Sequence, residues 1–130
     1  MVRTASCCCG ACRVEVEGEP VVNALCHCTN CRRRTGSAFG WSVYFADRQV
    51  MGRRGAFGLY EIAGERPQQR WFCAACGSTL LWKAAIRPHQ TGIAGGCFGE
   101  HPPLPAPAAT VSNTGRCAWL GLPADWRRSL

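Results

Sequence analysis

The chain has 130 residues, of which 47% are hydrophobic and 18% are charged, a balance that excludes an intrinsically disordered protein. Fifteen Lys and Arg residues against eight Asp and Glu residues give a formal net charge of +7, and Lys83 is the only lysine. No apolar run approaches the roughly 20 residues that a membrane-spanning helix needs, so no membrane association is expected.

This length predicts one domain over residues 1–130. Residues 1–4 are followed almost at once by the first cysteines and not by the apolar segment of a secretory signal, so we expect a cytoplasmic protein.

The first half of the chain carries short segments with β character, each closed by turn residues. Arg13–Glu17 alternates polar and apolar residues as a half-buried strand does, and residues 21–25 lead into Cys26. Two further strands are expected over residues 41–45 and 56–62, where aromatic and β-branched residues gather. No long window keeps the apolar spacing of a helix, so the sequence predicts a mainly β fold.

The second half continues this pattern. Residues 70–72 lead into Cys73 and residues 78–82 follow Gly77, so a hairpin is expected with its cysteines at the tip. The glycine-rich residues 91–97 predict a strand that a neighbour approaches closely. The proline-rich residues 101–107 predict an extended connection, because proline does not fit a central strand.

Eleven cysteines are far more than a chain of this length usually carries. An odd number fits a disulfide framework poorly, and in a reducing cytoplasm closely spaced cysteines favour metal binding. The interpretation that follows is a zinc protein, because thiolate-rich tetrahedral sites favour zinc.

Three cysteine clusters carry this signal. They are Cys7-Cys8-Cys9-Gly10-Ala11-Cys12, Cys26-His27-Cys28-Thr29-Asn30-Cys31 and Cys73-Ala74-Ala75-Cys76-Gly77. Alternate residues of an extended segment point the same way, which separates Cys7 and Cys9 from Cys8. One partition then pairs Cys7 and Cys9 with Cys73 and Cys76 in a closed structural site and leaves Cys26, Cys28 and Cys31 as an open site.

A rival partition remains open at this point, in which Cys28 and Cys31 join Cys73 and Cys76 in a zinc ribbon. The other cysteines, Cys8, Cys12, Cys97 and Cys117, are interpreted as packing residues or neighbours of the ligands. His27 lies between two expected ligands and is interpreted as a solvent-facing or supporting residue.

These motifs resemble the family of glutathione-dependent formaldehyde-activating enzymes, which includes the centromere protein V group. The matching elements are C-x-C-G at Cys7–Gly10, C-H-C-x-x-C-R at Cys26–Arg32 and F-C-x-x-C-G at Phe72–Gly77, within a match over about residues 5–126. The resemblance implies a β-tent of antiparallel strands. It also implies structural zinc ligands at Cys7, Cys9, Cys73 and Cys76 and catalytic ones at Cys26, Cys28 and Cys31.

The resemblance implies a zinc-dependent carbon–sulfur lyase activity that joins glutathione and formaldehyde, similar to that of S-(hydroxymethyl)glutathione synthase, with two zinc ions per chain. Arg32, Arg33 and Arg34 follow the open cluster and are candidates to bind the carboxylates of glutathione. The alternative is a non-catalytic zinc module that binds glutathione adducts, a protein or a nucleic acid. The missing aromatic and basic pattern argues against nucleic acid.

Overall fold

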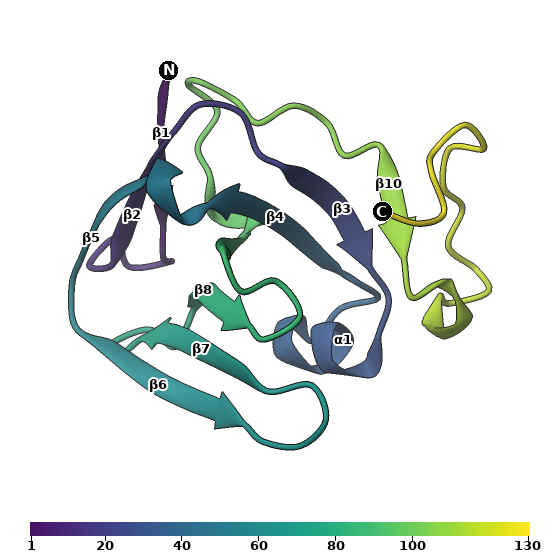
Figure 1. Cartoon of the computed structure of the whole chain (residues 1–130), viewed down its shortest axis with the longest axis horizontal. Helices are drawn as coiled ribbons and strands as arrows, with labels where there is room; N and C mark the ends of the chain where they lie inside the picture. The colour runs from purple at the N-terminus through teal and green to yellow at the C-terminus, as the bar shows by residue number, and fades with distance from the viewer.

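Ten strands and one short α-helix make up the structure, a computed structural model that describes residues 1–130 (Figure 1). The strands are β1 (Val2–Ser6), β2 (Arg13–Glu17), β3 (Val22–Cys26), β4 (Gly40–Ala46), β5 (Val50–Arg54), β6 (Phe57–Ile62), β7 (Gln68–Cys73), β8 (Thr79–Ala84), β9 (Gln90–Ala94) and β10 (Ala109–Val111). The helix α1 spans Thr29–Thr35, and the 3₁₀ turns are η1 (Asp47–Gln49), η2 (Gly95–Cys97) and η3 (Asn113–Gly115). The prediction of a mainly β fold is confirmed.

The strands form two sheets. The smaller has the order β1-β2-β5, and the larger has the order β10-β3-β4-β9-β8-β7-β6. All pairings are antiparallel except that of β10 with β3, which is parallel. In the larger sheet β8 and β9 join through only two residue pairs, whereas β4 and β9 join through five. The β6–β7 hairpin is therefore free to diverge from β3 and β4, and α1 lies across the space between them (Figure 1).

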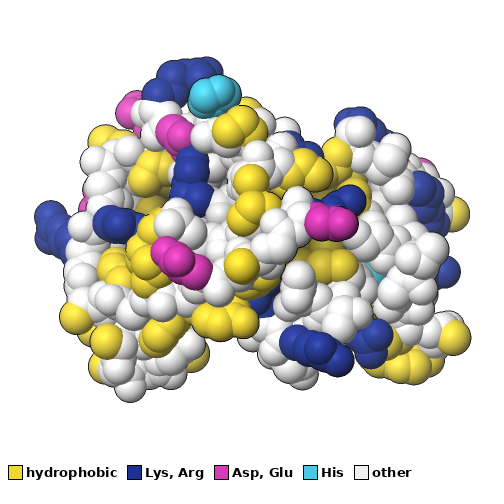
Figure 2. All heavy atoms as spheres, turned by 60° about the horizontal axis from the view of Figure 1, so that its bottom comes forward, with side chains coloured by type: hydrophobic (Ala, Val, Ile, Leu, Met, Phe, Trp, Pro, Cys, Tyr) yellow, Lys and Arg dark blue, Asp and Glu magenta, His cyan; other side chains and the backbone are white.

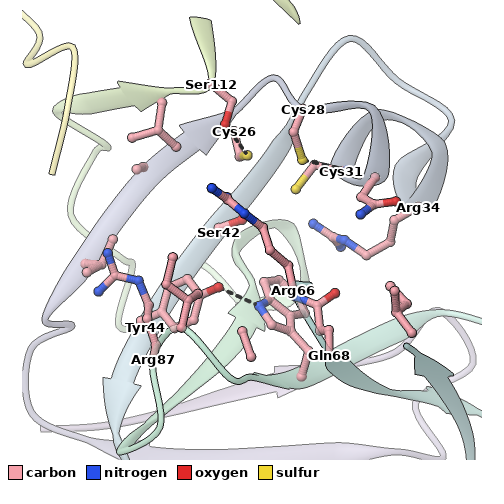
Figure 3. Close-up of a pocket in the computed structure, with 18 of the residues that line it drawn as sticks. Cys26, Cys28, Cys31, Arg34, Ser42, Tyr44, Arg66, Gln68, Arg87 and Ser112 are labelled. Atoms are coloured by element: carbon pink, nitrogen blue, oxygen red, sulfur yellow. Dashed lines mark hydrogen bonds between the residues drawn. The ribbon is translucent and has the colours of Figure 1, made fainter. Parts of the chain in front are cut away.

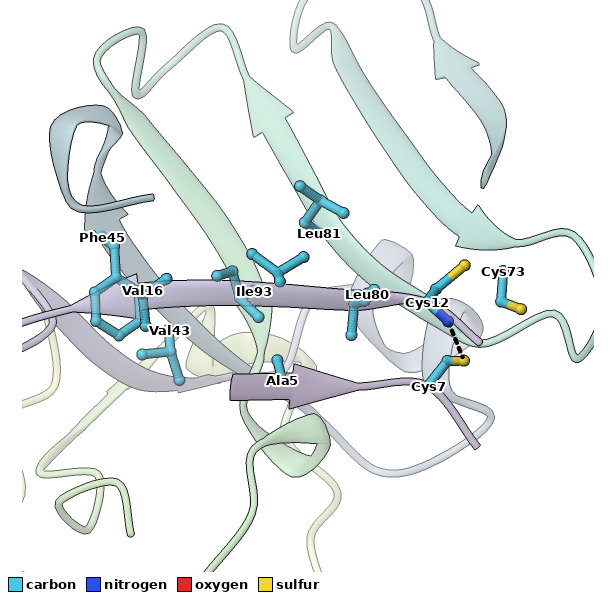
Figure 4. Packing of buried hydrophobic residues seen from close by; sticks show 11 residues of the cluster. Ala5, Cys7, Cys12, Val16, Val43, Phe45, Cys73, Leu80, Leu81 and Ile93 are labelled. Atoms are coloured by element: carbon cyan, nitrogen blue, oxygen red, sulfur yellow. Dashed lines mark hydrogen bonds between the residues drawn. The ribbon is translucent and has the colours of Figure 1, made fainter. Parts of the chain in front are cut away.

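The hydrophobic core lies between the two sheets. In β2 the alternation of the sequence directs Val14 and Val16 inward. These valines belong to a buried cluster with aliphatic and aromatic side chains of β4, β8 and β9, among them Phe45 and Leu80. Figure 4 shows Cys7, Cys12 and Cys73 at one end of this cluster. A change at this end of the core therefore affects the packing of both sheets.

The expected close approach in the glycine-rich segment is confirmed. A Cβ atom at Gly92 would overlap the indole of Trp82, and one at Gly95 would overlap the indole of Trp41. The strand itself ends at Ala94, and the chain continues as η2. The two missing side chains allow two large aromatic rings to pack on the backbone of this segment.

No helical segment has both the length and the hydropathy of a membrane-spanning helix. Basic side chains are scattered over the face seen in Figure 2, with acidic and hydrophobic side chains between them.

Candidate metal centres and pocket

Four cysteines from two distant parts of the chain form one cluster. Cys7 and Cys9 lie in the turn between β1 and β2, Cys73 ends β7, and Cys76 lies in the turn before β8. Their four Sγ atoms lie within 4.8 Å of one another. The Sγ atom of Cys9 is 3.7 Å from that of Cys7 and 3.7 Å from that of Cys73. We name this set the four-cysteine cluster.

The spacing of these sulfur atoms suits zinc. A tetrahedral site with Zn–S bonds of about 2.3 Å has sulfur atoms roughly 3.8 Å apart, close to the two distances above. Backbone N–H groups also point at the sulfur atoms, from Cys12 to Cys7 at 3.2 Å and from Ala75 to Cys73 at 3.4 Å. Such bonds stabilise thiolates, which is the form that binds metal. The donor set could therefore hold a zinc ion in a closed structural site.

Ser78 supports the exposed side of this cluster. Its hydroxyl lies 3.3 Å from the Sγ atom of Cys76 and accepts a hydrogen bond from the backbone N–H of Cys8 at 3.1 Å. Hydrogen bonds from the side chain and then the backbone of Ser78 lower the pKa of Cys76 to about 5. These bonds favour the thiolate form of Cys76, which is the form that binds metal.

Three other cysteines form a second cluster where β3 passes into α1. Cys26 ends β3, Cys28 is the N-cap of α1, and Cys31 lies in the first turn of the helix. Their Sγ atoms lie within 4.8 Å of one another. Cys28 and Cys31 therefore lie with Cys26 and not with Cys73 and Cys76, as the zinc-ribbon partition would require. We name this set the three-cysteine cluster.

The short cap of α1 brings these sulfur atoms together. The backbone N–H of Cys31 donates to the Sγ atom of Cys28 at 3.3 Å, as a side chain at an N-cap commonly accepts. Hydrogen bonds from Cys26 and then Cys31 lower the pKa of Cys28 to about 2, while the same crowding raises the pKa of Cys31. Three thiolates at this spacing repel one another, so a cation is needed to hold all three.

A pocket with a volume of about 300 Å³ opens beside the three-cysteine cluster (Figure 3). Its lining comes from α1, from β3, β4, β6, β7, β8 and β10, and from the loop between β6 and β7, and it contains no Asp or Glu. Four arginines lie among the lining residues: Arg34, Arg66, Arg70 and Arg87. The only two ion pairs of the structure join other residues, so these four cations have no carboxylate partner.

Arg34 lies closest to the cysteines by sequence, and the structure directs it into the pocket. Its guanidinium carbon is 4.4 Å from the centre of the Trp82 ring, and its Nη2 atom is buried without a hydrogen-bond partner. The absence of a side chain at Gly40 makes this possible, since a Cβ there would lie 2.6 Å from Nη2. Arg32 and Arg33 are exposed and do not line the pocket.

Arg66, Arg70 and Arg87 were not predicted as site residues. The guanidinium carbon of Arg87 lies 5.1 Å from the centre of the Tyr44 ring. In Figure 3 the side chain of Arg66 extends from its loop toward the cysteines. Burial lowers the pKa of Arg70, and the positive charge of Arg34 lowers it further. The pocket therefore favours an anion, which would relieve the repulsion between these guanidinium groups.

His27 is buried, contrary to the solvent-facing option for this residue. Its Nε2 atom lies 2.7 Å from the Oγ1 atom of Thr110, which donates its only proton to Oδ1 of Asn113 at 2.8 Å. The orientation of the Asn113 amide is fixed, because its Nδ2 donates to the carbonyls of Thr110 and Arg128. His27 must then donate from Nε2. This chain of bonds ties the segment between Cys26 and Cys28 to β10.

Replacing Thr110 with valine is expected to destabilise the fold by about 1–3 kcal/mol, because the Nε2 N–H of His27 would be left buried without an acceptor. Urea denaturation of both proteins measures the difference. Thr4→Val, at an exposed position of β1, is the matched control and should change the free energy of unfolding far less. An equal change in both variants would contradict the bond.

The remaining cysteines lie outside both clusters. Cys12 is buried beneath the four-cysteine cluster, Cys8 is exposed, and Cys97 and Cys117 are half-buried. The Sγ atom of Cys12 donates to the carbonyl of Ala56 at 3.3 Å. None of the eleven cysteines of the chain forms a disulfide.

The chain is similar to known proteins in both sequence and structure. The family model described as glutathione-dependent formaldehyde-activating enzyme matches residues 2–113. The crystal structure of a Rhodobacter sphaeroides protein, a structural genomics target, is similar with a TM-score of 0.54 and 26% sequence identity. That match covers 72% of this chain and 85% of the other. None of the curated proteins compared with the chain matches it.

Proposed function

Because the chain belongs to the glutathione-dependent formaldehyde-activating enzyme family, we propose that it is a zinc-dependent carbon–sulfur lyase-type enzyme that joins glutathione and formaldehyde. The observation that carries this proposal is the three-cysteine cluster in the wall of a cationic pocket. A metal held by three protein ligands has a fourth position for a substrate, which is the arrangement of catalytic rather than structural zinc sites. The product would be S-(hydroxymethyl)glutathione.

The two clusters are proposed to bind one zinc ion each. Cys7, Cys9, Cys73 and Cys76 would hold the structural ion, and Cys26, Cys28 and Cys31 the catalytic one. A catalytic zinc ion would keep the sulfur of glutathione deprotonated near neutral pH. We propose that the protein is cytoplasmic, because cysteines stay free of disulfides in that reducing compartment. One domain over residues 1–130 is proposed to carry both sites.

The reaction is the addition of a thiolate to an aldehyde. A bond forms between the glutathione sulfur and the carbonyl carbon, the π electrons of the carbonyl move to its oxygen, and that oxygen takes a proton from water. The lyase direction reverses these steps. The protein would hold the thiol and the aldehyde in one pocket next to the cysteines, which makes a bimolecular reaction effectively unimolecular.

The pocket arginines are proposed to bind glutathione, which carries two carboxylates. Arg34 and Arg87 are held against aromatic rings, so little side-chain freedom is lost when a carboxylate binds. The volume of about 300 Å³ is of the order that pockets for small ligands have. Among the three arginines that follow the cluster in sequence, Arg34 is therefore the one proposed for this role, because only Arg34 lines the pocket.

The experiment that tests the function is exchange spectroscopy by NMR on formaldehyde, glutathione and their adduct. Formaldehyde and thiols combine without a catalyst, so the decisive quantity is the exchange rate with zinc-loaded protein divided by the rate without protein. Acceleration that grows in proportion to protein concentration supports the proposal. Binding of glutathione without any acceleration would instead support the alternative of a non-catalytic module that binds glutathione adducts.

Replacing Arg87 with glutamine is expected to weaken glutathione binding about tenfold, because a charge-assisted hydrogen bond to a carboxylate is lost. Isothermal titration calorimetry gives the dissociation constant. Arg48, which is exposed and lies outside the pocket, provides the matched control Arg48→Gln. The diethyl ester of glutathione, which lacks both carboxylates, should bind the wild type and Arg87→Gln equally. A difference between the two proteins for the ester would contradict the assigned contact.

A further inference from the structure

Ser112 has a backbone conformation that no other residue except glycine adopts in this structure. It follows β10 directly and has a φ of 54° and a ψ of 45°, in the left-handed region. A residue with a side chain rarely adopts this conformation, which costs of the order of 1 kcal/mol or more and persists only where the surroundings impose it. Such residues are often found at functional sites.

The surroundings of Ser112 do impose it. The carbonyl of the preceding residue, Val111, accepts a hydrogen bond from the N–H of His27 at 3.1 Å, and the carbonyl of Ser112 accepts one from Gly115 at 3.1 Å. A Cβ at Gly115 would overlap the carbonyl of His27, so this turn packs directly on the backbone between Cys26 and Cys28. The bonds described above, from His27 to Thr110 and from Thr110 to Asn113, hold the same turn.

The consequence is the position of the Ser112 hydroxyl. Its Oγ atom lies 3.8 Å from the Sγ atom of Cys26, within the distance of a hydrogen bond to sulfur, and Ser112 lines the pocket. Figure 3 shows this hydroxyl above Cys26, on the side away from the helix that carries Cys31. While Cys26 is a thiol it donates to Ser112. A metal-bound thiolate has no proton, so Ser112 must then be the donor.

We propose that the Ser112 hydroxyl donates a hydrogen bond to the metal-bound thiolate of Cys26 and thereby promotes binding of a further thiolate at the three-cysteine cluster. This inference rests on the proposed function. Three thiolates and one Zn²⁺ carry a net charge of about −1, which opposes the approach of an anionic sulfur. A hydrogen bond to Cys26 withdraws part of that charge. Ser112 is thus a positioning residue, which acts through Cys26.

Two variants separate the hydroxyl from the backbone conformation. Ser112→Ala and Ser112→Gly both remove the hydroxyl, but glycine adopts the left-handed region without strain. Ser37→Ala, at an exposed position outside the pocket, is the control. The probes are glutathione and S-methylglutathione, whose dissociation constants are measured by calorimetry in a zinc-buffered solution that keeps both sites loaded. S-methylglutathione keeps the carboxylates but has no thiol that becomes a thiolate.

The wild type should bind glutathione more tightly than S-methylglutathione. In both Ser112 variants the ratio of the two dissociation constants should fall about tenfold. This is the lower end of the effect that removal of a group supporting a metal ligand usually has. Their affinity for S-methylglutathione should not change. Retention of the preference in Ser112→Gly would overturn the role of the hydroxyl, and so would an equal loss of affinity for both ligands. No preference in the wild type would contradict the proposed thiol site itself, with or without Ser112.

Discussion

Cys28→Ser is expected to retain the fold, to bind one zinc ion instead of two, and to accelerate the exchange between formaldehyde and glutathione at least roughly a hundredfold less than the wild type. A serine hydroxyl stays protonated at neutral pH and is a poor zinc ligand. Cys28 lies on the wall of the pocket and outside the hydrophobic core, so the two sheets should pack as before.

Metal stoichiometry by elemental analysis and thermal unfolding followed by circular dichroism measure the two parts of this prediction. Cys117→Ser changes a half-buried cysteine outside both clusters and should keep two zinc ions. Cooperative unfolding near the wild-type temperature together with one zinc ion would support a separable catalytic site. Global unfolding of Cys28→Ser, or only one zinc ion in the wild type, would contradict it.

Cys73→Ser, unlike Cys28→Ser, is expected to prevent stable folding. Cys73 is 1% exposed and belongs both to the four-cysteine cluster and to the hydrophobic core (Figure 4). Binding of a structural zinc ion contributes about 10–16 kcal/mol in small zinc domains, which is comparable to the whole stability of a domain. Loss of one ligand should therefore remove most of the net stability.

The matched control is Cys8→Ser, which changes an exposed cysteine between two members of the same cluster. Its unfolding temperature should stay near that of the wild type. Circular dichroism and limited proteolysis compare the two variants in zinc-containing buffer. A folded Cys73→Ser protein with both zinc ions would show that the four-cysteine cluster is not what stabilises this end of the core.

Seven of the ten strands and the two clusters could be predicted from the sequence because local patterns determine them, whereas β1, β5 and β10 were not expected. In Arg13–Glu17 the alternation of residues defines the buried face, and the spacing of Cys26, Cys28 and Cys31 brings three sulfur atoms together within one helical cap. Pairing of the first and third clusters was one of two partitions that the sequence left open. The geometry agrees with that grouping, and metal binding itself remains a prediction.

The pocket could not be predicted, because its residues come from elements that are distant in sequence. Arg66 lies in the loop between β6 and β7 and Arg87 follows β8, and neither belongs to a motif. The same holds for Ser112, whose conformation depends on packing against His27. A run of three arginines drew attention to Arg32 and Arg33, but helix geometry directs only Arg34 into the pocket.

The two clusters differ in how much chain lies between their members. Cys26, Cys28 and Cys31 are within six consecutive residues, whereas Cys9 and Cys73 are 64 positions apart. Closing a long loop costs more conformational entropy than closing a short one. If the clusters bind metal as proposed, the three-cysteine cluster is expected to do so on a nascent chain, while the four-cysteine cluster assembles only once β1, β2 and the β7–β8 hairpin have met. Metal binding at the proposed catalytic site would then precede folding, and metal binding at the proposed structural site would complete it.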